Sequence, residues 1–334
     1  MRRIGGKKKA GGLSWLSLFL SLIVVMITIG TAAAKTDFPS KQPITFIVPV
    51  SPGGGFDAFT RMLVPYLKKH LPGNPNIIVN NVPGKEWDLG ITKLYLSKPD
   101  GYTIGIFNMP ANCINQMMGT AKFDLTKMTW LGNISEVTYV TALSPNSKYK
   151  TLADLKNAPE VTCGVVGIAS TAGLGSVIAA QRMGIKMRPV THAGSTEAII
   201  SAIRGNVDWV QYPFSSIKKV ILDSHDLVPV WVYSKKRLKL LPNVPTIAEL
   251  GYPDLVDVVS MYRPIGAPPD LPKEEAKILK DALWKATNDP DFQKKMIEAN
   301  EPAMPMTSDE TAATVKKALA EVAKYKDLVS KYIK

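Results

Sequence analysis

The sequence has few of the residues on which metal centres, disulfide frameworks and hydrolase triads depend. Its 334 residues include two cysteines and three histidines. Two cysteines exclude a disulfide-dense scaffold, and no Cys/His cluster has the spacing of a zinc site. Hydrophobic residues make up 46% and charged residues 21% of the chain, which excludes general disorder. The length predicts about two domains.

The amino-terminal region has the three parts of a secretory signal. A basic start precedes an apolar run and a small-residue end, in the order Arg2, Arg3, Lys7, Lys8 and Lys9, then 13–30, then Thr31-Ala32-Ala33-Ala34. We predict a signal peptide over 1–34, cleaved after Ala34, and therefore a periplasmic protein. The alternative is an uncleaved membrane anchor, because the apolar run is near the length that spans a bilayer.

Acidic residues are outnumbered, 28 against 41 basic residues, so the formal net charge is +13. Removing 1–34 takes away five basic and no acidic residues and lowers the charge to +8. The remaining basic residues form short scattered groups without interleaved aromatics, which indicates a solvated surface and no nucleic-acid partner. Export would place Cys113 and Cys163 in an oxidising compartment, where they can pair or stay free.

Short apolar runs alternate with helical patterns, which predicts an α/β fold with parallel strands. A first set has strands at 44–50, 77–79 and 102–107, with helices through 59–67 and 87–96. A second set has strands at 161–166, 187–190, 207–210 and 227–232, with helices at 173–183, 197–203 and 217–222. Helices at 273–286, 290–298 and from 308 onward follow, the last opened by a capping box of Thr307 and Glu310. Two successive sets predict two similar α/β lobes.

Two glycine-rich stretches stand where a strand runs into a helix. The first is Ser-Pro-Gly-Gly-Gly-Phe-Asp at 51–57, and the second spans 164–175. Glycine lets the backbone approach a ligand, and the start of a helix favours an anion. Gly53-x-Gly55-x-x-Ala58 matches the dinucleotide fingerprint, but no acidic residue follows about 20 positions later, and export argues against a nicotinamide. We expect no cofactor and no metal, and a carboxylate as the anion.

Six short motifs follow one another along the chain. They are Pro43-Ile44 with 48–57 and Arg61; Asn81-Val82-Pro83-Gly84; 98–103; Gly205-Asn206-Val207-Asp208; 241–246 with Glu249 and Gly251; and Gly266-Ala267-Pro268. In this order they resemble the periplasmic solute-binding proteins of tripartite tricarboxylate transporters, the Bug or TctC family. The resemblance covers essentially the whole chain after residue 34.

The resemblance implies a two-lobed periplasmic-binding-protein type II fold, a Venus flytrap that closes over a small carboxylate. We expect lobe 1 at 35–137 plus 257–334 and lobe 2 at 138–256. The carboxylate is a di- or tricarboxylate or an aromatic acid, and the partners are integral membrane subunits; we expect a monomer. The implied ligand-binding residues are Ser51, Gly53, Gly54, Gly55, Phe56, Asp57, Gly167, Ile168, Ala169, Ser170 and Thr171. His192 follows a strand of lobe 2 and is added as a residue that can reach the cleft.

The sequence departs from the family pattern at places that bear on the ligand. Phe56 stands where Thr is usual, and Lys85-Glu86-Trp87 replaces small residues. Gly173 stands where a His often opens the second-lobe helix, and Val190-Thr191-His192 replaces Val-Pro-Tyr. Phe56 and Trp87 either form a cleft wall for an aromatic or longer acid, or pack without contacting ligand.

Catalytic patterns are sparse, and we expect no enzyme. Ser147-x-x-Lys150 and Ser215-x-x-Lys218 match a Ser-x-x-Lys pattern, which occurs by chance in a chain of this length, and no partner motif accompanies them. A secreted Ser/Lys-type hydrolase is therefore a minor alternative. A ligand-sensing receptor component of a signalling system is the other, and the sequence does not separate it from a transport protein.

Overall fold

The computed structural model describes residues 1–2, 5–6 and 37–332, except Gly54, Glu86, Ala169, Asn300 and Pro302. The predicted signal peptide therefore lies almost wholly outside the described residues. Residues Phe38–Lys334 form one compact unit. Among the described residues, no helix combines the length and the apolar character needed to cross a bilayer.

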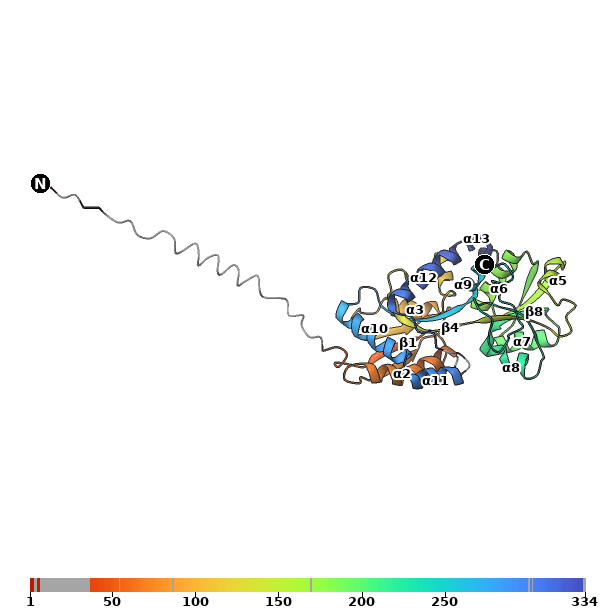
Figure 1. Cartoon of the computed structure of the whole chain (residues 1–334), viewed down its shortest axis with the longest axis horizontal. Coiled ribbons are helices and arrows are strands. Elements are labelled where there is room, and N and C mark those ends of the chain that lie inside the picture. Colours follow the sequence, from red (N-terminus) through yellow and green to blue (C-terminus); the bar gives the residue numbers. More distant parts are fainter. Residues whose placement is uncertain are drawn as a thin grey trace. The chain divides into compact units, whose positions relative to one another are not determined.

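The first lobe is built on a five-stranded sheet of order β2-β1-β3-β10-β4 (Figure 1). Its strands are β1 (Ile44–Val48), β2 (Ile77–Asn81), β3 (Thr103–Ile106), β4 (Thr129–Val137) and β10 (Met261–Ala267). Its helices are α2 (Gly55–His70), α3 (Asp88–Tyr95), α4 (Cys113–Met118), α10 (Lys273–Thr287), α11 (Pro290–Glu298) and α12 (Ser308–Ala323). β1 runs parallel to β2 and β3, whereas β10 runs antiparallel to β3 and β4.

The second lobe repeats this plan with a sheet of order β7-β6-β8-β5-β9. Its strands are β5 (Tyr139–Leu143), β6 (Val161–Val165), β7 (Met187–Thr191), β8 (Trp209–Pro213) and β9 (Val228–Val232). Its helices are α5 (Leu152–Asn157), α6 (Thr171–Met183), α7 (Ser195–Ile203), α8 (Phe214–Leu222) and α9 (Asp254–Val259). β6 runs parallel to β7 and β8, and β5 runs antiparallel to β8 and β9.

The α/β prediction is therefore confirmed, and the expectation of parallel strands is wrong for part of each sheet. The antiparallel strands β4, β5 and β10 were not predicted at all. The helix expected from 308 onward is two helices, since α12 ends at Ala323 and α13 begins at Lys326 and ends at Ser330. Its predicted capping box is present: Thr307 Oγ1 accepts from the Glu310 amide at 3.3 Å, and Glu310 Oε2 accepts from the Thr307 amide at 2.8 Å.

The chain passes from the first sheet to the second where β4 ends at Val137 and β5 begins at Tyr139. It returns through α9 into β10, and α9 packs against both α6 and α12. We propose lobe boundaries at 137/138 and 256/257; the second boundary falls within α9, so this helix is part of the crossing between the lobes. Further contact between the lobes comes from α13, which packs against α4 and α6.

Each lobe has a core of large buried side chains. Phe46 and Phe292 are fully buried in the first lobe, and Trp209, Trp231 and Tyr233 in the second. The two tryptophan rings meet edge to face at 5.7 Å between centroids. Burial of each such side chain stabilises the fold by about 1.5–3 kcal/mol. The buried side chains therefore stabilise both sheets, and the sheets position the loops at their carboxyl ends.

Candidate functional site

The first glycine-rich loop is held from beneath by a buried carboxylate. Asp57, in the first turn of α2, is 4% exposed, and its Oδ2 accepts a hydrogen bond from the Gly53 amide at 2.9 Å. Arg61 Nε donates to both Asp57 oxygens at 3.0 Å, and Asn81 Nδ2 donates to Oδ1 at 3.0 Å. The residues Ser51, Gly53 and Gly55 themselves are exposed. Both Asp57 oxygens thus accept hydrogen bonds from the protein itself, while the residues of the loop are exposed to solvent.

The same contacts set the charge state of Asp57. The hydrogen bond from Arg61, followed by those from the Gly53 amide and the Asn81 side chain, outweighs burial and lowers the pKa of Asp57 to about 2. Asp57 is therefore ionised at neutral pH, and Arg61 compensates its charge. We assign Asp57 to holding the loop, because a second carboxylate beside an ionised one is repelled.

The second loop is closed against the start of α6. Ser170 Oγ donates to the Gly167 carbonyl at 2.7 Å and accepts from the Gly173 amide at 3.0 Å, so this serine is the N-cap of α6. A Cβ at residue 173 would stand 1.9 Å from the Gly167 carbonyl oxygen. Glycine at 173 is what lets the loop lie this close to the helix.

A cavity of about 210 Å³ lies between the two lobes. Its lining combines residues near α3 and α4 of the first lobe with the second glycine-rich loop: Trp87, Asn108, Ala111, Ile114, Asn115, Val166, Gly167 and Ser170. Its polar groups are two side-chain amides and the serine at the start of α6. None of these eight side chains is charged.

A direct hydrogen bond joins the lobes beside this cavity. Thr171, the first residue of α6, donates from Oγ1 to Asn108 Oδ1 at 3.0 Å. The backbone N–H of Asn108 in turn donates to Asn112 Oδ1 at 2.6 Å. The side chains of Thr171, Asn108 and Asn112 are all buried. Asn108 and Asn112 were missed by the sequence analysis. The only signal for them was their place directly after a predicted strand, where binding residues gather in α/β folds.

Phe56 and Trp87 contact each other but differ in their position relative to the cavity. Their rings meet edge to face at 4.4 Å between centroids, but only Trp87 lines the cavity. Trp87 takes a left-handed conformation, with φ 82° and ψ −20°, immediately before α3. Such backbone costs about 1–3 kcal/mol in a non-glycine residue and gathers at binding sites. Phe56 lies behind Trp87, with the Arg263 guanidinium 5.2 Å from its ring centroid.

The other predicted site residues lie outside this lining. His192 is half-buried; its amide donates to the Val165 carbonyl at 2.8 Å, and its Nδ1 lies 2.9 Å from the Val190 carbonyl. Ile168 packs partly buried against the core. Gly54 and Ala169 are outside the described residues. Around one cavity the structure thus assembles Trp87, Gly167 and Ser170, with Thr171 beside them, and it leaves Ser51, Gly53, Gly55, Phe56, Asp57 and His192 off its lining.

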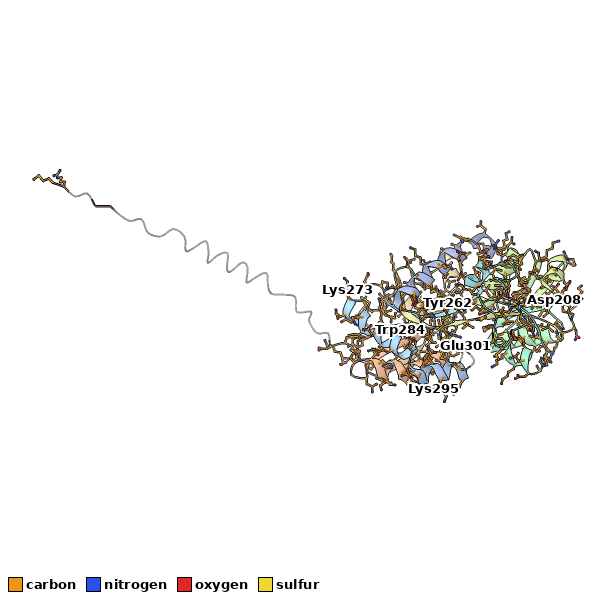
Figure 2. The ribbon with its side chains drawn as sticks, viewed as in Figure 1. Asp208, Tyr262, Lys273, Trp284, Lys295 and Glu301 are labelled. Atoms are coloured by element: carbon orange, nitrogen blue, oxygen red, sulfur yellow. The ribbon has the colours of Figure 1, made fainter. Side chains whose placement is uncertain are left out.

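Glu301 of the first lobe takes part in an ion pair within that lobe and in a second link to the other lobe. Arg263 on β10 is 3% exposed; its Nη1 lies 2.5 Å from Glu301 Oε2 and donates to Ser135 Oγ at 2.7 Å. Ser215, at the start of α8 in the second lobe, donates to Glu301 Oε1 at 2.6 Å. Figure 2 labels Glu301. One carboxylate thus joins a strand of the first lobe to a helix of the second.

The remaining reactive side chains are engaged or buried. Lys150 Nζ donates to the Pro145 carbonyl at 2.8 Å, and the Ser147 hydroxyl accepts from the Tyr149 amide, so this Ser-x-x-Lys pair serves a turn. Cys113 and Cys163 are both free and buried, and burial raises the pKa of Cys163 to about 12. Across the described part of the chain, no group of three His, Cys, Asp or Glu side chains is placed to hold a metal.

Comparison with known proteins agrees with this architecture. The chain is 28% identical to protein BugT of Bordetella pertussis over 253 residues, 72% of this chain and 76% of that protein. A TctC solute-binding protein from Polaromonas has the same fold, with a TM-score of 0.74, 23% identity, and coverage of 88% of this chain and 99% of that one. An R. palustris protein solved with adipate superposes with a TM-score of 0.69, 21% identity, and coverage of 88% and 99%.

The sequence profile of the tripartite tricarboxylate transporter family receptor, TctC, matches residues 60–332. This match begins within α2 and ends at the last described residue, so it includes the whole second sheet and every strand of the first except β1. The fold prediction of a two-lobed periplasmic binding protein is confirmed with it. The chain belongs to the tripartite tricarboxylate transporter receptor family, TctC.

Proposed function

We propose that this chain captures a small organic carboxylate between its two lobes and delivers it to the membrane subunits of a tripartite tricarboxylate transporter. The observation that carries the proposal is the cavity between the lobes, which receives lining residues from both. Membership of the receptor family supports transport, and the related fold solved with adipate supports a dicarboxylate as ligand.

The cavity favours an anion held by neutral groups. Ser170 and Gly167 stand at the start of α6, a helix of 13 residues whose first amides and dipole favour a negative charge. The amides of Asn108 and Asn115 supply further donors. A volume of about 210 Å³ is below the range of about 300–1,000 Å³ usual for larger ligands, so a short dicarboxylate fits better than a tricarboxylate.

Closure is the step that couples binding to delivery. A ligand that contacts both lobes binds the closed arrangement more tightly than the open one and shifts the population toward it. The membrane subunits then recognise the closed form. We place the chain in the periplasm as a monomer, with 1–34 removed on export, and we assign it no catalytic step.

A thermal-shift and calorimetry screen with succinate, adipate, citrate and benzoate tests this function. A bound acid raises the melting temperature by mass action, and we expect the largest shift from a short dicarboxylate. Mass spectrometry of the acid after long incubation should show it unchanged. Turnover of the acid would contradict a purely binding role, and the absence of any response to the panel would contradict carboxylate capture.

The variant Asn108→Ala tests the site itself. We expect it to weaken the dicarboxylate by about 10-fold or more, because a ligand carboxylate loses a buried donor. Asn146→Ala is the matched control, since Asn146 is exposed and lies away from the cavity. Equal affinities of the two variants would place the ligand elsewhere.

A further inference from the structure

A buried arginine lies directly behind the lining of the cavity near Trp87. Arg263, on β10, is 3% exposed, and it stands opposite Asn108, which lines the cavity. The next pair along, Met109 and Tyr262, exchanges both of its backbone hydrogen bonds, at 3.1 and 2.8 Å. Asn108 and Arg263 are therefore a non-hydrogen-bonded antiparallel pair, whose side chains lie close together on one face of the sheet. A guanidinium thus stands beside a cavity whose eight lining side chains are uncharged.

The guanidinium of Arg263 has an unused donor. Its Nη1 lies 2.5 Å from Glu301 Oε2 and donates to Ser135 Oγ at 2.7 Å. Its Nε is buried and has no hydrogen-bond partner among the described residues. Buried N–H groups are normally matched by an acceptor, and guanidinium donors suit carboxylates in particular. Arg263 can therefore serve a second carboxylate at Nε while Glu301 stays at Nη1.

The ring of Phe56 contacts both this guanidinium and the lining of the cavity. Arg263 Cζ lies 5.2 Å from the centroid of the Phe56 ring. The same ring meets Trp87 edge to face at 4.4 Å between centroids. Trp87 lines the cavity, whereas Phe56 is partly buried and does not line it. One aromatic ring thus fills the space between a lining residue and a positively charged one.

This position of Phe56 limits how far the cavity extends. Behind Trp87, an acid meets the ring of Phe56 and not the guanidinium of Arg263. The resulting volume of about 210 Å³ is small for a long-chain acid. Because a protein interior collapses only partly around a truncated side chain, a smaller residue at 56 would leave room that extends the cavity toward Arg263.

We propose that Phe56 determines the length of the acid that this chain binds. Its ring keeps the acid away from Arg263, so the cavity accepts a short dicarboxylate and binds a longer one more weakly. With the ring removed, the second carboxylate of a longer diacid reaches Arg263 Nε. This inference rests on the proposed function, since it concerns the acid bound near Trp87.

Calorimetric titration of the full chain with succinate, adipate and hexanoate tests the proposal, and we expect the parent chain to favour succinate over adipate. Phe56→Ala should raise the ratio of adipate affinity to succinate affinity by about 10-fold or more, because the two further methylenes of adipate are then buried. Phe56→Val, which opens less space, should raise it by about 3-fold or more. Hexanoate has the chain length of adipate but one carboxylate, so it should gain less than adipate in both variants.

Phe214→Ala is the matched control, because Phe214 is also a partly buried phenylalanine but stands at the start of α8 and does not line this cavity. It should keep the ratio of the two affinities within about 2-fold of the parent value. A parent chain that prefers adipate would overturn the proposal, as would an unchanged ratio in Phe56 variants that still bind succinate; either result leaves dicarboxylate capture standing. Equal gains for hexanoate and adipate would overturn the part given to Arg263. Failure of the parent chain to bind any diacid would contradict dicarboxylate capture itself, and this inference with it.

Discussion

At the scale of single residues, two carboxylates, one buried and one partly buried, each hold several segments together. Asp57 gathers Gly53, Arg61 and Asn81 under the first glycine-rich loop. Glu301 joins Arg263 to Ser215 across the lobes. In each case the carboxylate accepts hydrogen bonds from donors on separate segments, so its removal should destabilise several segments at once.

Asp57→Asn should lower the free energy of unfolding at neutral pH and reduce the loss of that free energy as the pH falls. The fold lowers the pKa of Asp57 from 3.8 to about 2, so the charged form stabilises the protein above pH 4. That contribution is lost as the pH falls from about 4 to about 2. Loss of a hydrogen-bonded charge typically costs about 1.5–3 kcal/mol. Urea unfolding at a series of pH values measures both effects. Asp223→Asn, at an exposed position, is the control, and identical acid profiles for the two variants would refute the role given to Asp57.

Breaking the Arg263–Glu301 pair from one side should be more damaging than replacing both partners. Glu301→Leu leaves a guanidinium that is 3% exposed without its counter-charge, at a cost of about 3–5 kcal/mol. The double variant Arg263→Met/Glu301→Leu removes the unpaired charge and should be more stable than the sum of the single effects predicts. A double-mutant cycle by urea unfolding gives the coupling energy. Additive effects would show that the pair is not coupled.

At the scale of elements, helix α6 and the loop before it form one unit. Ser170 caps the helix while its hydroxyl holds the Gly167 carbonyl, and Gly173 leaves room for that carbonyl one turn further. A side chain at 173 would not fit beside the Gly167 carbonyl as the loop lies in this chain. The shape of the cavity on its second-lobe side follows from this packing.

Gly173→Ala should displace the loop and weaken dicarboxylate binding by about 10-fold or more. An added Cβ would stand 1.9 Å from the Gly167 carbonyl oxygen and 2.9 Å from Ile168 Cα, so backbone must move. Gly194→Ala is the control, because Gly194 precedes α7 in extended backbone with nothing within 4 Å of the added atom. Calorimetry with the dicarboxylate found in the screen compares them, and full affinity in Gly173→Ala would contradict this account.

The same scale shows why some elements were predicted and others were missed. Strands β1 and β6 run into glycine-rich turns and helices, and that order of strand, turn and helix is visible in the residues. β4, at 129–137, and β5, at 139–143, are buried on nearly every residue. They therefore lack the alternation that marks a half-exposed strand, and no turn separates them. β10, which pairs antiparallel with β4, was missed for the same reason.

At the scale of the whole molecule, the lobes are joined by more than the chain that crosses between them. Thr171 bonds to Asn108 on one side, and Ser215 bonds to Glu301 on another. Both bonds use a residue at the start of a second-lobe helix. A ligand that binds between the lobes adds to contacts that are already present, so those contacts set part of its affinity.

Thr171→Val should weaken the interlobe contact without changing side-chain volume greatly. The lost hydrogen bond leaves Asn108 Oδ1 without its donor at a buried position, and an unsatisfied buried group costs about 1–3 kcal/mol. We expect a larger radius of gyration in small-angle scattering without ligand and about 3- to 10-fold weaker dicarboxylate binding. Thr191→Val, at an exposed position at the end of β7, should change neither. An unchanged radius and affinity in Thr171→Val would show that this bond does not control closure.

By itself, the sequence determined the α/β class, the positions of both glycine-rich loops and the family, because these depend on local order and on motifs of consecutive residues. It also pointed to Trp87, Gly167 and Ser170, which do line a cavity between the lobes. Only the tertiary structure showed that Asp57 accepts hydrogen bonds from within its own loop region and that Asn108 accepts one from Thr171. The same holds for the contacts of Glu301 with Arg263 and Ser215. The two hydrogen bonds between the lobes join residues that are 63 or more positions apart in the sequence. The contacts of Asp57 depend on where strand β2 places Asn81. Local patterns carry no information on such pairs, since only the tertiary packing brings them within hydrogen-bonding distance.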